Sequence, residues 1–328
     1  MRVAVLGSNS FAGGDFVDLL LEMGRHDILG ISRSPEKPVA FRPYARQQRG
    51  RFVFKQLDLN RHFDEVRAAL DAFEPHYVVN LAAQGDDAAS WTHPQDFFMT
   101  NCVASAALID HLKDRTYLQR YLQISSSSVY GNLPSIATEE TPVSPRSPYA
   151  VSKAATDLLL LAYHTSFGFP AQIVRPPNLY GPFQDLFRIV PKSIVTLKKG
   201  GAIDLHGGGE AVRFYLHVRD ASRAILAILE RGATGEIYNV SPDEGNRIRD
   251  IVAIVCDLLG KDFDSSTRHV ADRRDQQSGL SLDSMKIRRR LGWSPQVSLR
   301  VGIEGVRDWI ERDWEYLVRQ PLVYAHKA

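Results

Sequence analysis

The feature that most constrains this chain is an alternation over residues 1–175. Short apolar runs there alternate with segments whose apolar residues recur at helical spacing. Such runs, separated by helices, are typical of a parallel sheet covered on both faces. Right-handed crossovers then give a Rossmann-like, doubly wound α/β fold. Strands are predicted at Arg2–Leu6, Asp27–Ser32, Phe52–Leu57, Tyr77–Asn80, Arg120–Ser125 and Ala171–Arg175. Helices are predicted at Phe16–Met23, Arg61–Ala72, Gln95–Leu112 and Tyr149–Phe167.

The regular alternation ends near Arg175, and proline and glycine then mark loops. At roughly 150 residues per domain, 328 residues suggest two units. We therefore expect a Rossmann domain over residues 1–175. Residues 176–328 are expected to form a smaller, mixed region over the open end of the sheet, with some strands returning to the main sheet. Ligands of such sheets bind beyond the carboxyl ends of the strands.

Composition excludes several classes of function. With 40 basic and 38 acidic residues, the chain gives no reason to expect binding to nucleic acid or to a membrane surface. No apolar run approaches the roughly 20 residues that span a bilayer. Only two cysteines are present, and the histidines are scattered without an HExxH pattern, so no metal site is expected. The amino terminus lacks the features of a secretory signal, and a cytoplasmic location is expected.

A glycine loop follows the first predicted strand. Gly7 and Gly13 keep the outer spacing of a dinucleotide-binding loop, with Ser10 where related loops have a middle glycine and Phe11 beside it. Glycine allows the backbone to approach a pyrophosphate, and the N-terminus of the next helix attracts its charge. The alternative is a simple turn, but the strand–loop–helix context favours a nicotinamide dinucleotide.

The end of the second strand bears on the choice between NAD and NADP. An acidic residue there binds the ribose hydroxyl of NAD, whereas an arginine accommodates the phosphate of NADP. This chain has Ser32 and Arg33 and no acid before Glu36, which favours NADP unless Arg33 is only a surface residue. Asp58 is either an adenine contact or an ordinary turn residue.

Tyr149 and Lys153 lie four residues apart on a predicted helix and therefore on one face. A tyrosine with a pKa near 10 is a poor base at neutral pH. A neighbouring ammonium, together with the positive charge of an oxidised nicotinamide, favours the phenolate. Tyr149 then accepts the proton of a substrate hydroxyl while hydride leaves the same carbon.

Several ordered motifs accompany this pair. They include Asn80-Leu-Ala-Ala-Gln84, Asn101, Ser125–Ser128 before Val129-Tyr130-Gly131, Ser147-Pro148-Tyr149, Arg175-Pro-Pro-Asn178, Arg213 to Asp220, and Leu291-Gly-Trp293. With them the chain resembles an extended short-chain dehydrogenase/reductase of the nucleotide-sugar epimerase/dehydratase family. The resemblance covers nearly the whole chain and does not specify a substrate. It implies a carbohydrate-biosynthetic enzyme in which residues 1–175 bind NAD(P) and residues 176–328 mainly bind a nucleotide-diphosphate sugar.

The resemblance also implies roles for individual residues. Ser126 hydrogen-bonds the substrate hydroxyl and Tyr149, and Lys153 binds the nicotinamide ribose. The expected cofactor contacts are Gly7, Ser10, Phe11, Gly13, Ser32, Arg33, Asp58, Leu59, Leu81, Ala82, Ala83, Tyr149 and Lys153. The expected substrate contacts are Gln84, Ser126, Asn178, Arg213 and Arg273, the arginines because a guanidinium pairs well with phosphate. Either arginine could instead serve a structural ion pair or the surface.

One departure bears on the reaction. The 4,6-dehydratases of the family carry an acid pair, or at least a glutamate, where this chain has Ser127 and Ser128. Neither hydroxyl is a competent acid or base near neutral pH without activation. C4 epimerisation, or a simple C4 oxidation or reduction, needs no such pair and is the preferred prediction. Dehydration by a GDP-mannose or dTDP-glucose type of enzyme remains the alternative, with Asp86 or Asp87 as a relocated acid unless these residues are only a solvated loop. A catalytically silent, NADP-sensing binding protein is the third reading.

The family resemblance further implies a homodimer built on a four-helix bundle. The segments concerned are Gln95–Leu112 and the helix that carries Tyr149 and Lys153. Leu158–Leu161 and Ala162 could form the contact face or belong to the core.

Overall fold

The computed structural model describes residues 1–46, 51–133, 135–271 and 279–327. Its centre is a seven-stranded sheet in the order β11-β6-β5-β4-β1-β2-β3, in which every neighbouring pair is parallel. The strands are β1 (Arg2–Leu6), β2 (Asp27–Ser32), β3 (Arg51–Gln56), β4 (Tyr77–Asn80), β5 (Arg120–Ile124), β6 (Ala171–Arg175) and β11 (Glu236–Asn239). This is the strand order of a doubly wound dinucleotide-binding fold with one added edge strand.

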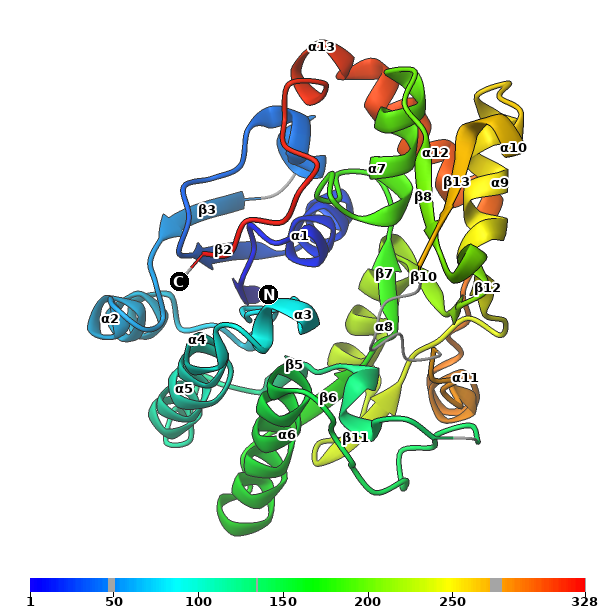
Figure 1. Cartoon of the computed structure of the whole chain (residues 1–328). Coiled ribbons are helices and arrows are strands. Elements are labelled where there is room, and N and C mark those ends of the chain that lie inside the picture. The colour runs from blue at the N-terminus through cyan, green and yellow to red at the C-terminus, as the bar shows by residue number, and fades with distance from the viewer. Residues whose placement is uncertain (47–50, 134, 272–278, 328) are drawn as a thin grey trace.

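Helices cover both faces of the sheet, as the apolar strands require (Figure 1). Because side chains alternate along a strand, Val3 and Val5 enter one core layer and Ala4 and Leu6 the other. The first layer packs against α1 (Phe11–Met23) and α8 (Val218–Arg231). The second packs against α2 (Phe63–Phe73), α5 (Ala104–Leu112) and α6 (Pro148–Phe167).

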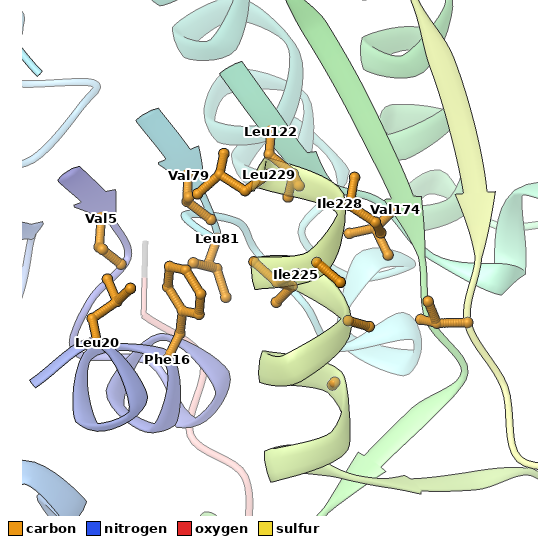
Figure 2. Packing of buried hydrophobic residues seen from close by; sticks show 14 of the residues in the cluster. Val5, Phe16, Leu20, Val79, Leu81, Leu122, Val174, Ile225, Ile228 and Leu229 are labelled. Atoms are coloured by element: carbon orange, nitrogen blue, oxygen red, sulfur yellow. The ribbon is translucent and has the colours of Figure 1, made fainter. Parts of the chain in front are cut away.

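Figure 2 shows the first layer in detail. Phe16 and Leu20 of α1 and Ile225 and Ile228 of α8 lie over the same sheet face. A helix that follows residue 175 thus completes the core of the N-terminal sheet, and β11 extends the sheet beyond β6. The doubly wound fold is confirmed, whereas the division at residue 175 stays a prediction.

The remaining elements form a smaller mixed region with its own core, beside the carboxyl ends of the strands (Figure 1). Three two-stranded sheets lie there: β7 (Asn178–Tyr180) with β10 (Tyr215–His217), β9 (Val212–Arg213) with β12 (Asn246–Arg247), and β8 (Ile203–His206) with β13 (Thr267–Val270). The helices of this region are α7 (Ile189–Lys198), α9 (Ile248–Leu258), α10 (Phe263–Ser266), α12 (Leu299–Arg312) and α13 (Trp314–Leu317). Helix α11 (Met285–Leu291) instead packs on the first core layer of the main sheet through Ile287 and Leu291. Among the described residues no helix is long and apolar enough to cross a bilayer.

The bounds of all four predicted helices differ from the structure, the last by one residue, because α6 begins at Pro148 rather than Tyr149. The first helix begins at Phe11, because the Ser10 side chain caps it, although Gly13 and Gly14 hide its start in the sequence. The second begins at Phe63 rather than Arg61. The segment predicted as one helix from Gln95 consists of α4 (Pro94–Phe98), a π-helical stretch (Met99–Val103) and α5, preceded by the short α3 (Asp87–Ser90).

Candidate active site

The glycine loop after β1 is closely packed, which explains its composition. Gly7 has φ of 80°, and a Cβ atom there would lie 2.6 Å from the Ala82 nitrogen. A Cβ on Gly13 would lie 2.2 Å from the Gly7 carbonyl oxygen, so neither position accepts a side chain. The Ser10 hydroxyl accepts the Gly13 N–H at 3.0 Å and starts α1. The earliest N–H groups of a helix lack intrahelical partners, so the Phe11 end of α1 can hold a phosphate.

One cavity of about 1870 Å³ runs from this loop along the carboxyl ends of the strands. Its size exceeds the roughly 300–1,000 Å³ of a single small-ligand site, so it can hold a dinucleotide and a second ligand together. Every residue predicted to contact the cofactor lines it except Gly13, which packs against the Gly7 carbonyl group. The predicted Gln84, Ser126, Asn178 and Arg213 also line it, whereas Arg273 lies outside the described residues.

The part of the cavity wall that follows β2 and β3 carries one arginine, Arg33, and two acids, Glu36 and Asp58. Arg33 lies in the wall directly after β2. Glu36, the first acid after this strand, accepts hydrogen bonds from Arg42 at 2.6 Å and from the Tyr44 hydroxyl at 3.0 Å. The Asp58 carboxylate accepts the Asn60 N–H at 2.7 Å, so it shapes the turn after β3 while lining the cavity.

Helix α6 brings Tyr149 and Lys153 into the middle of the cavity. The Ser147 hydroxyl caps this helix and Pro148 occupies its first turn, a strong starting signal. Lys153 is buried and donates a hydrogen bond to the Ile124 carbonyl oxygen at the end of β5. Burial lowers the pKa of the Lys153 ammonium to about 8.

Burial raises the pKa of the Tyr149 phenol, so the phenol is protonated at neutral pH in the free protein. The Asp87 carboxylate raises this pKa further, and hydrogen bonding with Ser126 lowers it. The Ser126 hydroxyl accepts the Ser128 N–H at 3.1 Å and donates to the Ser128 hydroxyl at 3.2 Å. Proton transfer to Tyr149 therefore requires a further positive charge in the cavity.

A buried network behind this pair escaped the sequence interpretation. Asp157 lies one helical turn after Lys153, is fully buried, and pairs with Arg175 at 2.9 Å. It also accepts the Ser125 hydroxyl at 2.8 Å, while the Arg175 guanidinium lies 4.7 Å from the centre of the Tyr130 ring. The network ties α6 to the ends of β5 and β6. The signal was the i, i+4 spacing from Lys153 to Asp157 on one helix face.

Ser127 and Ser128 line the cavity, and no carboxylate accompanies them in that turn. The two predicted auxiliary acids differ in their surroundings. Asp86 caps α3 through the Ala89 N–H at 3.1 Å and lies 3.7 Å from Arg188, so it is held by structural contacts. Asp87 accepts a hydrogen bond from the Ser147 hydroxyl and acts electrostatically on Tyr149.

The C-terminal region lines the cavity with cations and with two carboxylates, those of Asp185 and Asp204. Arg188 and Lys192 of the α7 region line the cavity together with Arg213, and the sequence interpretation missed the first two. Gln84 is buried, and its side-chain amide donates to the Lys327 carbonyl oxygen at 2.7 Å. Asn101 accepts the Gln84 N–H at 2.8 Å, which fixes the backbone of this loop.

Comparison with known proteins identifies the family to which a chain with this fold and site is similar. Residues 3–241 match the model of the NAD dependent epimerase/dehydratase family. A dTDP-glucose 4,6-dehydratase of Streptomyces griseus is 32% identical over 330 residues, covering 97% of each chain.

Two solved structures are similar over nearly their whole length. A dTDP-glucose 4,6-dehydratase of Streptomyces venezuelae, crystallised with NAD, has a TM-score of 0.88 at 31% identity and covers 96% of this chain and 98% of its own. A UDP-glucuronic acid 4-epimerase of Bacillus cereus, in complex with UDP-glucuronic acid and NAD, has a TM-score of 0.86 at 25% identity and covers 95% and 99%. The chain therefore belongs to the NAD dependent epimerase/dehydratase family.

Proposed function

We propose that this protein oxidises C4 of a nucleotide-activated hexose with a nicotinamide dinucleotide. Tyr149 accepts the proton of the C4 hydroxyl while the C4 hydride passes to the nicotinamide ring. Ser126 holds the reacting oxygen, and Lys153 binds the nicotinamide ribose and favours the phenolate. The observation that carries the proposal is the meeting of Ser126, Tyr149 and Lys153 in one cavity that is also lined by the glycine loop and by Arg188 and Arg213 of the C-terminal region.

The preferred net reaction is C4 epimerisation, or a simple C4 oxidation or reduction. Ser127 and Ser128 stand where the dehydratases of the family carry acids, and a serine hydroxyl does not shuttle protons near neutral pH without activation. An epimerase needs only to turn the 4-keto sugar and return the hydride to its other face. Tyr149 and the cofactor supply both transfers.

Dehydration to a 4-keto-6-deoxy sugar is the second candidate, because two observations favour it. The relatives of highest similarity described above include dTDP-glucose 4,6-dehydratases. Asp87 also lines the cavity and acts on Tyr149 electrostatically. In this candidate Asp87 takes part in proton transfer when the C5 proton and the C6 hydroxyl leave as water. The hydride then returns from the cofactor to C6 while a solvent-derived proton returns to C5.

Proton NMR of the purified protein with GDP-, dTDP-, UDP- and CDP-hexoses in D2O separates the candidates. Inversion at C4 without a methyl signal is expected. A new C6 methyl signal with deuterium incorporated would instead establish dehydration. No change in any sugar nucleotide would leave the silent cofactor-binding reading.

Two substitutions assign the residues. Tyr149→Phe is expected to abolish turnover while cofactor binding, followed by fluorescence titration, stays within about twofold of wild type. Asp87→Asn is expected to retain epimerisation and to lose dehydration. Full turnover by Tyr149→Phe contradicts the assigned base.

We infer that NADP is preferred over NAD, because Arg33 lies at the ribose end and Glu36 is engaged by Arg42 and Tyr44. Arg33→Ala is expected to weaken NADP binding by about tenfold or more, the loss of one charge-assisted phosphate contact, and to leave NAD binding nearly unchanged. Equal losses for the two cofactors would contradict this inference.

We also infer a homodimer, and a cytoplasmic location that suits the two free cysteines.

A further inference from the structure

The C-terminal segment, residues 318–327, returns from α13 to the cofactor side of the molecule (Figure 1). Tyr324, Ala325 and Lys327 form part of the cavity wall. Leu322 packs against the core of the C-terminal region, but beyond it the apolar contacts are few, since Val323 remains 69% exposed and the Tyr324 ring meets Phe187 with ring centres 5.2 Å apart. Besides the hydrogen bond from Gln84 to the Lys327 carbonyl oxygen, the end of the segment is therefore held by a few side-chain contacts.

Those contacts gather at His326. Its Nε2 atom lies 2.7 Å from an Asp96 carboxylate oxygen, and its ring stacks on His93 with centres 4.1 Å apart and planes 8° apart. One ligand atom from each of these three residues lies within 4.8 Å of the other two. It is the one such cluster of three potential metal ligands that the described part of the chain contains. We propose that His93, Asp96 and His326 bind a divalent transition-metal ion of the zinc class.

The donor set fits such an ion. Imidazole and carboxylate together suit zinc, cobalt and nickel rather than calcium or magnesium, which prefer oxygen ligands alone. With bonds of about 2.0–2.2 Å, tetrahedral ligands of zinc stand roughly 3.4 Å apart. The two imidazole rings are stacked and nearly parallel, so one of them must turn out of the stack before both nitrogens point at the same ion. The ligand atoms already lie within 4.8 Å of one another, and water would complete the shell.

The surroundings of the two imidazoles support the same assignment. The His326 Nδ1 atom lies 3.3 Å from the Tyr324 hydroxyl, so its Nε2 atom is the one left to face Asp96 and an ion. A partner on the second ring nitrogen is the usual way to orient a ligating histidine. The His93 side chain is exposed at the start of α4 and makes no hydrogen bond to the described residues, so its ring can turn toward the ion.

The bound ion would fasten the C-terminal segment over the cavity. His93 and Asp96 belong to the start of α4, whereas His326 lies 230 residues beyond Asp96 in the sequence. Phe97 contacts both the His326 ring and the Tyr149 ring, at 6.1 and 6.2 Å between centres. The ion would thus brace the wall of aromatic rings beside Tyr149, without itself touching the substrate.

Metal binding is tested directly on the full chain after treatment with EDTA. Isothermal titration with Zn²⁺ is expected to give one site per chain, and Co²⁺ to give a visible d–d absorption band. His326→Ala and His93→Ala are each expected to weaken zinc binding more than about tenfold, at least the loss known for residues that merely support a ligand. His269→Ala removes an exposed histidine elsewhere and is expected to change nothing.

Limited trypsin digestion measures how firmly the C-terminal segment is held, and it does not depend on enzyme activity. Cleavage after Arg319, followed by mass spectrometry, is expected to slow when Zn²⁺ is added to wild type and to ignore Zn²⁺ in His326→Ala. Asp96→Asn keeps both imidazoles and is expected to show an intermediate response. Absence of zinc binding, binding that survives both histidine substitutions, or cleavage of wild type insensitive to Zn²⁺ would each leave only an ion pair with a stacked ring and overturn the proposal.

Discussion

At the scale of single residues, the site disfavours the charged forms of the two side chains that the proposed chemistry uses. Burial disfavours both the Tyr149 phenolate and the Lys153 ammonium, raising one pKa and lowering the other. An oxidised nicotinamide supplies the positive charge that favours the phenolate. We therefore expect Tyr149 to act as a base only when the oxidised cofactor is bound.

The buried ammonium of Lys153 gives a prediction about stability. Its pKa is about 8 in the folded protein against an ordinary value of 10.5. Below pH 8 both states are charged and the burial cost is fully present. Between these pH values the unfolded state binds more protons, so stability rises with pH, by up to about 3 kcal/mol. In cofactor-free protein, the free energy of unfolding of wild type minus that of Lys153→Met is expected to increase as the pH rises from 8 to 10.5.

Urea unfolding at several pH values measures this difference, because other titrating groups are common to both proteins. A constant difference across that range would mean that Lys153 titrates normally.

The same residue shows where prediction from the sequence stops. The four-residue spacing predicts that Tyr149 and Lys153 share a face, but the lowered pKa comes from the packing of α6 against β5, which no local pattern reveals.

At the scale of elements, α6 carries an exposed apolar stripe. Val151, Ala155, Leu158 and Ala162 follow helical spacing and are all exposed, whereas Leu160 lies in the core. Met99 and Val103 on the neighbouring π-helical stretch are 48% and 52% exposed. A continuous apolar face on two adjacent helices favours the dimer inferred above.

Leu158→Glu places a charge in that face and is expected to convert a dimer into a monomer, measured by light scattering at micromolar concentration. Val301→Glu is the matched control, since Val301 is similarly exposed, at 57% against 56%, but lies on α12. The control is expected to leave the mass unchanged. A wild-type monomer, or a dimer in both variants, would exclude this face as the interface.

The bounds of helices and strands were predicted best where they depend only on residues that are neighbours in the sequence. The predicted bounds of β1, β2, β4 and β6 agree with the structure, because continuous apolar runs flanked by turns leave little choice. The π-helical stretch at Met99–Val103 was missed, since one widened turn barely changes an apolar period. The serine cap of α6 was visible as Ser147 before Pro148, but the role of that hydroxyl toward Asp87 was not.

At the scale of the whole molecule, contacts between distant segments decide both fold and site. Gln84 meets Lys327, Asp96 meets His326, and α1 meets α8 across the nominal boundary at residue 175. No periodicity links such segments, so the sequence predicted a region on either side of residue 175 but not the contacts that join them. The cationic lining by Arg188 and Lys192 was missed for the same reason.

The joint between α1 and α8 centres on one side chain. Arg219 of α8 is ion-paired with Asp15 at 3.3 Å, with Glu22 at 2.8 Å and with Asp18. Asp15 and Asp18 are 8% and 5% exposed, and burial raises the pKa of Asp15 despite its partner. Removing the cation leaves the buried Asp15 carboxylate without its ion-pair partner, which is more costly than the pairing itself is favourable.

Arg219→Met is therefore expected to lower the free energy of unfolding by about 3 kcal/mol or more, since methionine replaces the stem but not the charge. Arg300→Met removes an exposed pair with Asp257 and is expected to cost less than about 1 kcal/mol. Chemical denaturation of the cofactor-free proteins measures both changes. The loss in Arg219→Met should shrink as pH falls and the carboxylates take up protons. Equal, small losses in the two variants would mean that apolar packing alone joins α8 to the helix that begins the cofactor site.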